Sequence, residues 1–327
     1  MELVSKKRRL LFAGSGHPAL AEEIAQGLGE PLASVTLSNF ANGELYCRYD
    51  ESLRGADVFV LQTHCDPIND RIMEQLVMID AAKRASAKRI TAVAPFYGYA
   101  RQDRKAAGRE PITARLLADL LTVAGADRVV SVDLHTGQIQ GFFDFPVDHL
   151  TAVPLLAAYV GSRIDGDVTV VAPDAGGGKL ARRFANCLEE AGQEAELAFV
   201  DKSRPKGTHN IAIANDVVGV IDGRHCVLID DMIDTAGSIT AGAQLLVDRG
   251  AASVVIAATH GLLSGPAVDG LKNAPVREVV VTNTLPIAAD KQFDSLTVLS
   301  IAPIVADALD AVFADSSVSE LFQGDNV

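Results

Sequence analysis

Short apolar runs alternate with helical patterns along almost the whole chain. The runs are apolar on both faces, as strands buried inside a parallel sheet must be. This alternation predicts βαβ units and an α/β fold built from doubly wound parallel sheets. The strand-like runs include residues 89–95, 128–134, 168–174, 226–231, 253–259 and 278–283, and the helical patterns include 68–85, 112–124, 179–191 and 238–249.

A weak internal repeat divides this pattern in two. A helical segment, a glycine and an apolar run lead to His135, and a similar series leads to His260, at an offset of 125 residues. The length of 327 residues is also enough for about two domains of roughly 150 residues each. We therefore expect two tandem domains, residues 1–152 and 153–327, and allow for a C-terminal helix that packs on the first domain. Residues 201–215 have no period and predict a long loop.

Composition narrows the class of protein. Lys and Arg number 29 against 42 Asp and Glu, so the net charge is −13, which argues against a broadly basic nucleic-acid surface or a polybasic membrane anchor. No apolar run approaches the roughly 18 residues of a membrane span, and the run after the charged N-terminus is too short for a signal peptide. The four cysteines form no CxxC pair. We expect a cytoplasmic protein with reduced thiols.

The strongest functional signal is an acidic turn after the apolar residues 227–229. Asp230 and Asp231 follow directly, and Asp234 comes shortly afterwards. The small, hydroxyl-bearing stretch 235–238 then opens a helical pattern, where free N–H groups and the helix dipole favour an anion. Because carboxylates accept hydrogen bonds from vicinal hydroxyls, this turn predicts a site for a phosphorylated sugar. A plain helix cap would need one Asp or Ser rather than three acids.

Other polar residues stand at strand ends, but composition alone gives them ordinary explanations. Arg101 and Gln102 follow a strand-like run, where a guanidinium can bind phosphate oxygens, yet the charged stretch 101–105 by itself favours a surface ion pair. His135 ends another such run, and a lone histidine is more often structural than a ligand. Asp174 precedes Ala-Gly-Gly, which would let a ligand approach the backbone.

A resemblance to a known family covers nearly the whole chain. The acidic turn resembles the loop that binds phosphoribosyl diphosphate (PRPP) in type I phosphoribosyltransferases and in class I PRPP synthetases, the ribose-phosphate diphosphokinases. Further motifs, all in family order, are those of the synthetases. The resemblance implies two phosphoribosyltransferase-like domains, the first binding ATP and the second ribose 5-phosphate. The motifs are residues 40–44, 96–105, 132–148, 173–177, 201–205, 227–239, 259–261 and 281–283.

The resemblance also implies a reaction. The β,γ-diphosphoryl group of Mg-ATP would pass to the 1-hydroxyl of ribose 5-phosphate, giving PRPP and AMP. Lys202 and Arg204, which composition alone would treat as solvated charges, become the catalytic pair on a closing flap. His135 and Asp174 become ligands of Mg²⁺, although a neutral histidine is a less typical ligand of that ion.

Binding and control follow from the same resemblance. It implies a homohexamer whose adenine site is completed by a neighbouring subunit, activation by inorganic phosphate and inhibition by ADP. The ATP-binding residues would be Phe40, Asn42, Gly43, Glu44, Arg101 and Gln102, although Phe40 alone would be assigned to a core. The ribose 5-phosphate-binding residues would be Arg204, Asp230, Asp231, Asp234, Thr235, Ala236, Gly237 and Ser238. The regulatory positions would be Ser52, Arg54, Gln140 and Asp148.

Three other interpretations are weaker. Gly14-Ser-Gly16 imitates a dinucleotide fingerprint, but Pro18 intervenes and no acid follows at the required spacing. A phosphoribosyltransferase would share the acidic turn but would have no need of Arg101, Gln102 or the Phe40 segment. A non-catalytic regulatory subunit would be expected to lack part of the catalytic set, which is complete here.

Overall fold

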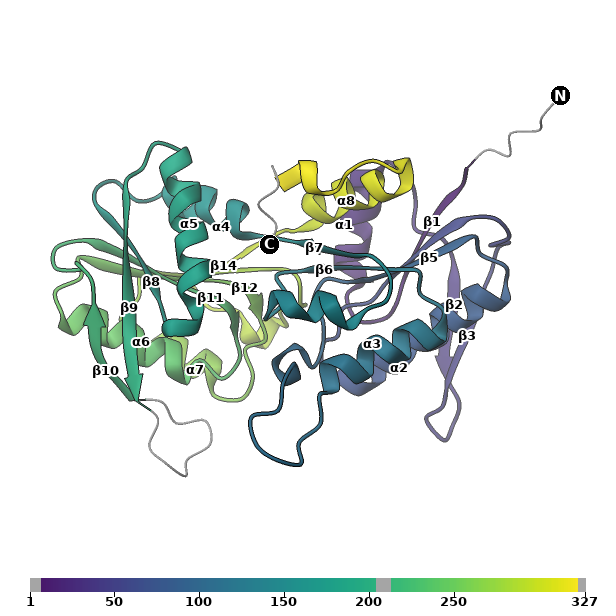
Figure 1. The fold of residues 1–327 in the computed structure, drawn as a ribbon, viewed down its shortest axis with the longest axis horizontal. Helices are drawn as coiled ribbons and strands as arrows, with labels where there is room; N and C mark the ends of the chain where they lie inside the picture. Colours follow the sequence, from purple (N-terminus) through teal and green to yellow (C-terminus); the bar gives the residue numbers. More distant parts are fainter. Residues whose placement is uncertain (1–6, 204–212, 323–327) are drawn as a thin grey trace. The chain divides into compact units, whose positions relative to one another are not determined.

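The computed structural model describes residues 7–203 and 213–322, and the chain divides into two units (Figure 1). Unit 1 consists of Met1–Thr151, Thr284–Pro286 and Ser300–Val327, and unit 2 of Ala152–Asn283 and Ile287–Leu299. The chain therefore returns to unit 1 briefly at Thr284–Pro286 and again, from Ser300, for its last helix. Among the described residues no helix is both long and apolar enough to cross a membrane.

Unit 1 contains a five-stranded parallel sheet in the order β1-β4-β5-β6-β7. Its centre is apolar on both faces: every residue of β4 is buried, as the sequence pattern predicts for an inner strand. The helices α2 and α3 pack together, as do α1 and α8. The bounds are β1 Arg9–Ala13, β4 Asp57–Leu61, β5 Arg89–Ala94, β6 Arg128–Val132, β7 Val147–Leu150, α1 Pro18–Leu28, α2 Ile68–Arg84, α3 Thr113–Ala124 and α8 Ala302–Ala314.

An antiparallel hairpin of β2 (Val35–Asn39) and β3 (Leu45–Tyr49) stands apart from this sheet. Its inner residues pack on the core of unit 1, where Tyr49 meets Phe12 edge to face with the ring centroids 4.4 Å apart. The tip of the hairpin, residues 40–44, is exposed.

Unit 2 contains a seven-stranded sheet in the order β10-β9-β8-β11-β12-β13-β14, parallel except for β10 at one edge. Two apolar cores fill its two faces, one with α4 and α5 and the other with α6 and α7, so this sheet is doubly wound (Figure 1). The bounds are β8 Val168–Ala172, β9 Ala195–Ser203, β10 Ile213–Val218, β11 His225–Ile233, β12 Ser253–Gly261, β13 Glu278–Thr282, β14 Leu296–Leu299, α4 Val153–Gly161, α5 Gly178–Glu190, α6 Gly237–Asp248 and α7 Ala267–Asn273.

The expectation of a long loop over residues 201–215 is wrong at both of its ends. Strand β9 continues to Ser203, and β10 begins at Ile213. Beyond Phe199, where its pairing with β8 stops, β9 is held by β10 through pairs such as Val200 with Val217. Edge strands carry polar residues that face solvent, so no apolar alternation marks them in the sequence.

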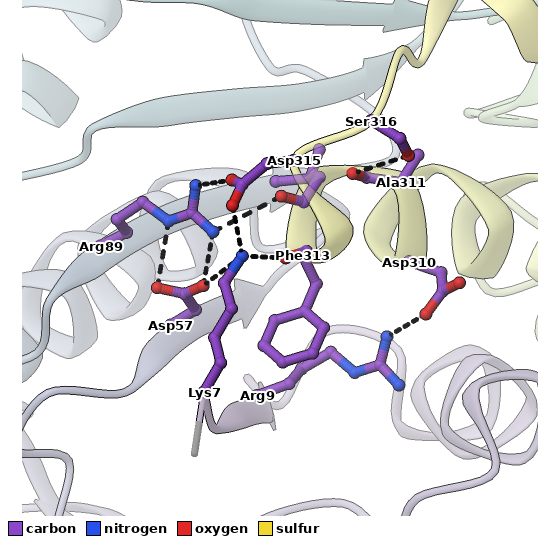
Figure 2. A network of polar contacts seen from close by, with 10 residues as sticks. Lys7, Arg9, Asp57, Arg89, Asp310, Ala311, Phe313, Asp315 and Ser316 are labelled. Carbon is purple, nitrogen blue, oxygen red and sulfur yellow. Dashed lines mark hydrogen bonds and ion pairs between the residues drawn. The ribbon is translucent and has the colours of Figure 1, made fainter. Parts of the chain in front are cut away.

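The last helix, α8, is fastened to unit 1 by a network of charges (Figure 2). Arg89 binds the buried Asp57 through both of its carboxylate oxygens and also reaches Asp315, just beyond the end of α8. Lys7 Nζ lies 2.7 Å from Asp315 Oδ2. Hydrogen bonds from Lys7 and Arg89 lower the pKa of Asp315 to about 2. These cations also lie at the negative end of the α8 dipole. The end of α8 is therefore held beside the first residues of β1, β4 and β5.

Candidate functional site

The acidic turn lies where β8 and β11 end beside each other in the sheet of unit 2. The two strands are parallel neighbours, so their carboxyl ends share one edge, the usual place for a ligand in an open α/β sheet. Asp174 comes just after β8, and Asp230 and Asp231 lie in the last part of β11, which extends to Ile233. The sequence thus placed the acids correctly at the strand end, although the strand itself is longer than expected.

Asp230 occupies an unfavourable electrostatic environment. Burial, followed by the charge of Asp231 and a hydrogen bond with it, raises the pKa of Asp230 well above its usual range, and the charge of Asp174 raises it further. The backbone N–H of Asp231 donates to Asp230 Oδ1 at 2.9 Å, which partly offsets this effect. Three carboxylates therefore act on one another here, and the turn attracts cations and hydroxyl donors.

The start of α6 supplies the opposite chemistry. Ala236 adopts a left-handed backbone with φ of 62°, and it caps the helix without any side-chain hydrogen bond to the first N–H groups. Thr235, Gly237 and Ser238 are exposed around it. A helix start of this kind presents its N–H groups to solvent and favours an anion such as a phosphate.

The backbone of the acidic turn is held by the residues that follow β12. The N–H groups of Leu262 and Leu263 both donate to the Ile233 carbonyl at 3.0 Å, and the N–H of Ser264 donates to the Asp234 carbonyl at 2.8 Å. The connection between β12 and α7 therefore fixes the backbone of the acidic turn.

Asp174 caps the short turn that follows β8. Its Oδ1 accepts hydrogen bonds from the N–H groups of Gly176 and Gly177, at 2.8 and 3.2 Å. None of the described residues donates to its second oxygen, Oδ2, which is an anionic oxygen of the type that Mg²⁺ binds. A cavity of about 590 Å³ opens beside it, a size suited to a small ligand, and is lined by Asp174, Ala175, Gly176, Phe199, Val200, Asp201 and Val218.

In unit 1, Arg101 and Gln102 lie on a short 3₁₀ helix, Ala100–Gln102, soon after β5. Both are exposed, and the turn begins at Tyr99 with φ of 60°. The N–H of Gln102 donates to the Tyr99 carbonyl at 2.8 Å, and Thr113 at the start of α3 donates to Gln102 Oε1 at 2.6 Å. The pair is thus presented to solvent on a fixed turn at the carboxyl edge of the sheet.

The next strand brings His135 to the same edge. His135 is exposed in the loop after β6, and Asp133 before it has a positive φ of 37°. Thr136, the residue after His135, donates to Asp103, the residue after Gln102, with Oγ1 to Oδ2 at 2.7 Å. The structure therefore joins the segments of two predicted site residues, Gln102 and His135.

The Phe40 segment forms the tip of the β2–β3 hairpin. Phe40 is 55% exposed, so its assignment to a core, which residue type alone favours, is wrong. The backbone closes tightly, since the Phe40 N–H donates to the Glu44 carbonyl and the Gly43 N–H to the Phe40 carbonyl, both at 2.8 Å. Asn42 Oδ1 accepts from the Glu44 N–H at 3.2 Å. A rigid hairpin thus exposes an aromatic ring on a sheet separate from that of Arg101.

The four predicted regulatory residues fall into two separate pairs. Ser52 and Arg54 are exposed just before β4, whereas Gln140 and Asp148 belong to the loop before β7 and to β7 itself. Two strands, β5 and β6, separate β4 from β7. Asp148 is also engaged by Arg128 at 2.5 Å.

The predicted catalytic pair is described only in part. The backbone of Lys202 belongs to β9, opposite Ala214 of β10, and Arg204 lies outside the described residues. His135 belongs to unit 1 and Asp174 to unit 2. Within residues 7–203 and 213–322, no group of three His, Cys, Asp or Glu side chains could hold a metal ion without further ligands.

The glycine-rich loop after β1 carries a carboxylate of the protein itself. Glu74 Oε1 accepts from the N–H of Ser15 at 2.6 Å and from Gln62 Nε2 at 2.5 Å, and the Ser15 hydroxyl donates to the same carboxylate. Sequence reasoning rejected a dinucleotide site here from spacing. It had no signal for Glu74, which lies far along the chain in α2.

Comparisons with known proteins cover the chain almost entirely. Two family models match, the N-terminal domain of ribose phosphate pyrophosphokinase over residues 9–125 and the phosphoribosyl synthetase-associated domain over residues 171–323. The ribose-phosphate pyrophosphokinase of Streptomyces coelicolor is 55% identical over 323 residues, covering 98% of both chains. That of Mycobacterium tuberculosis is 54% identical over 322 residues, again covering 98% of both. The crystal structure of phosphoribosylpyrophosphate synthetase from Mycobacterium smegmatis matches with a TM-score of 0.89 at 54% identity, over 95% of this chain and 100% of that one.

Proposed function

The chain belongs to the ribose-phosphate pyrophosphokinase family, and from that premise we propose how its residues make PRPP. The enzyme transfers the β,γ-diphosphoryl group of ATP to the 1-hydroxyl of ribose 5-phosphate and releases AMP. The observation that carries the proposal is the acidic turn on β11 beside the uncapped start of α6. A sugar phosphate needs acceptors for its hydroxyl groups and a site for its phosphate, and this one short segment offers both.

Ribose 5-phosphate binds across this turn. Its phosphate is held by the N–H groups and hydroxyls of residues 235–238, next to Asp234, and Arg204 adds a cation. Its 2- and 3-hydroxyls donate to Asp230 and Asp231. Because the backbone of the turn is anchored by Ser264 and its neighbours, the sugar meets a preformed site and the loss of entropy on binding is small.

ATP binds to the exposed turn of Arg101 and Gln102, and the guanidinium pairs with phosphate oxygens. The rigid tip of the β2–β3 hairpin, with Phe40, Asn42, Gly43 and Glu44, holds the adenine. On the family resemblance, we assign this tip to the adenine site of a neighbouring subunit.

The residues fit Mg²⁺ as a bound ion. Asp174 offers a carboxylate oxygen that no described residue occupies, and the exposed His135 follows the strand next to that of Arg101. When bound, Mg²⁺ neutralises charge on the phosphate oxygens of ATP, which complete its shell together with water.

The anomeric hydroxyl attacks the β-phosphorus in line, and AMP leaves. Lys202 and Arg204 stabilise the charge that builds on the phosphoryl oxygens in the transition state. No covalent intermediate is required. Lys202→Ala should therefore reduce kcat by at least about 100-fold with little change in ATP affinity. A large loss of ATP binding with intact turnover would contradict this role.

We assign the enzyme to the cytoplasm as a homohexamer controlled by inorganic phosphate and ADP. The residues that the family resemblance assigns to this control are Ser52, Arg54, Gln140 and Asp148, which are all present in this chain.

One assay tests the function directly. The protein is mixed with Mg-ATP and ribose 5-phosphate, with and without phosphate, and AMP and PRPP are measured. We expect both products in equal amounts. PRPP consumption without AMP would indicate a phosphoribosyltransferase, and inactivity under every condition would indicate a regulatory subunit.

A further inference from the structure

Asp103 is a buried carboxylate in a segment that the sequence presents as solvated surface. It lies between Gln102 and Arg104 in a run of charges, yet it is only 8% exposed. A carboxylate taken out of water is costly unless it accepts hydrogen bonds. Its burial therefore calls for specific partners.

Those partners come from one other loop. Asp103 Oδ2 accepts from Thr136 Oγ1 at 2.7 Å and from Gln138 Nε2 at 3.2 Å. Thr136 follows His135 directly and Gln138 lies two residues further on, both in the connection between β6 and β7. The strands that precede the two loops, β5 and β6, are parallel neighbours, so their loops emerge side by side at the carboxyl edge of the sheet.

We propose that Asp103 is a positioning residue that locks the turn of Arg101 and Gln102 to the loop of His135. The inference rests on the proposed function, in which Arg101 and Gln102 bind ATP and His135 meets its metal. If two loops bind one nucleotide, fixing their separation beforehand reduces the entropy that is lost on binding. Asp103 touches no substrate in this scheme and acts only through its neighbours.

We expect the contacts of Asp103 to affect the binding of ATP but not the binding of ribose 5-phosphate. The residues proposed for ribose 5-phosphate lie on β11 and α6 of unit 2, or on the segment after β9, and none of them contacts Asp103 through a described bond. Loosening the Asp103 contacts should therefore weaken ATP binding and leave ribose 5-phosphate binding unchanged. A purely structural residue would lower the stability of unit 1 without this division between substrates.

The test uses a matched pair at Thr136 in the full-length enzyme. Thr136→Val keeps the shape and removes the donor, and Thr136→Ser keeps the hydroxyl. We expect Thr136→Val to raise KM for ATP by about threefold to tenfold, as for one lost hydrogen bond. KM for ribose 5-phosphate should stay within about twofold and Thr136→Ser should resemble wild type. Calorimetry with Mg-ATP alone should show the same weakening.

A double-mutant cycle separates positioning from independent effects. If Thr136 acts through Asp103, then Asp103→Ala with Thr136→Val should raise KM for ATP no more than Asp103→Ala alone. Additive effects, an unchanged KM for ATP in Thr136→Val, or an equal rise for both substrates would overturn the inference. Should Asp103→Ala fail to fold, the comparison of Thr136→Val with Thr136→Ser decides the inference. A wild-type enzyme that makes no AMP would instead refute the proposed function.

Discussion

Replacing Asp230 with asparagine should stabilise the folded enzyme near neutral pH while it removes activity. Burial and the neighbouring charges of Asp231 and Asp174 raise the pKa of Asp230 well above its usual range. The folded chain therefore holds a proton over a pH range in which the unfolded chain has already released it. In that range the free energy of unfolding falls as the pH rises. Asparagine carries no charge to lose, so this part of the pH dependence should disappear.

The size of the effect follows from removing one buried like charge. We expect the free energy of unfolding of Asp230→Asn to exceed that of wild type by about 1–2 kcal/mol at pH 7.5. For a unit of this size, each kcal/mol raises Tm by about 2–4 °C. Near pH 4, where Asp230 is protonated in the folded chain, the two proteins should be nearly equal in stability. PRPP formation should fall at least about tenfold, because the amide is a poorer acceptor for a sugar hydroxyl.

Thermal melts between pH 4 and pH 8 check both statements. Asp234→Asn is the control, since it makes the same change in net charge within the same turn. The reasoning would be refuted if Asp230→Asn melted below wild type at pH 7.5, or if the two profiles stayed parallel over the whole range. An equal gain in Asp234→Asn would indicate a general effect of net charge rather than the surroundings of Asp230.

Three further changes test the fold and the ATP site. Gly16→Ala should lower the free energy of unfolding by about 1–3 kcal/mol, because a Cβ would lie 2.6 Å from Gln62 Oε1; an unchanged urea midpoint would contradict this. Asp57→Ala removes a carboxylate that is only 2% exposed and should lower the free energy of unfolding by about 2–3 kcal/mol. The exposed Asp310→Ala should lower it by less than about 1 kcal/mol. Equal losses in guanidinium unfolding would refute this prediction. Phe40→Ala should raise KM for ATP with a stability change below about 0.5 kcal/mol, and an unchanged KM would remove Phe40 from the adenine site.

The inner strands could be predicted because a strand buried on both faces appears in the sequence as a short run of apolar residues. Strand β8 is buried at every position, and its run of five apolar or β-branched residues is a pattern that loops seldom show. The parts of β9 and β10 within residues 201–215 were missed because β9 beyond Phe199 pairs with the edge strand β10 instead of with β8. Such pairing depends on which strands end beside one another, and this is decided by the whole sheet.

The residues of the proposed site also differ in whether they could be identified from the sequence. The turn of Asp230 and Asp231 could be identified from the sequence because all of its chemistry lies within a dozen consecutive residues. Asp103 could not, because its donors Thr136 and Gln138 are 33 and 35 residues away. The roles proposed for Phe40 and Lys202 came only with the family resemblance, since their own sequence surroundings are ordinary.

The loop after β1 already holds a carboxylate of the protein where an anion could otherwise bind. Its backbone resembles an anion site at the start of a helix, yet the Glu74 carboxylate already accepts from the Ser15 N–H and hydroxyl, and Gln62 closes the remaining space. A phosphate would have to displace this buried carboxylate from its Ser15 donors, and the loss of hydrogen bonds to a charged group would oppose its binding. The α6 start has no such internal anion among the described contacts. We therefore expect inorganic phosphate to bind at the start of α6 rather than at the loop after β1.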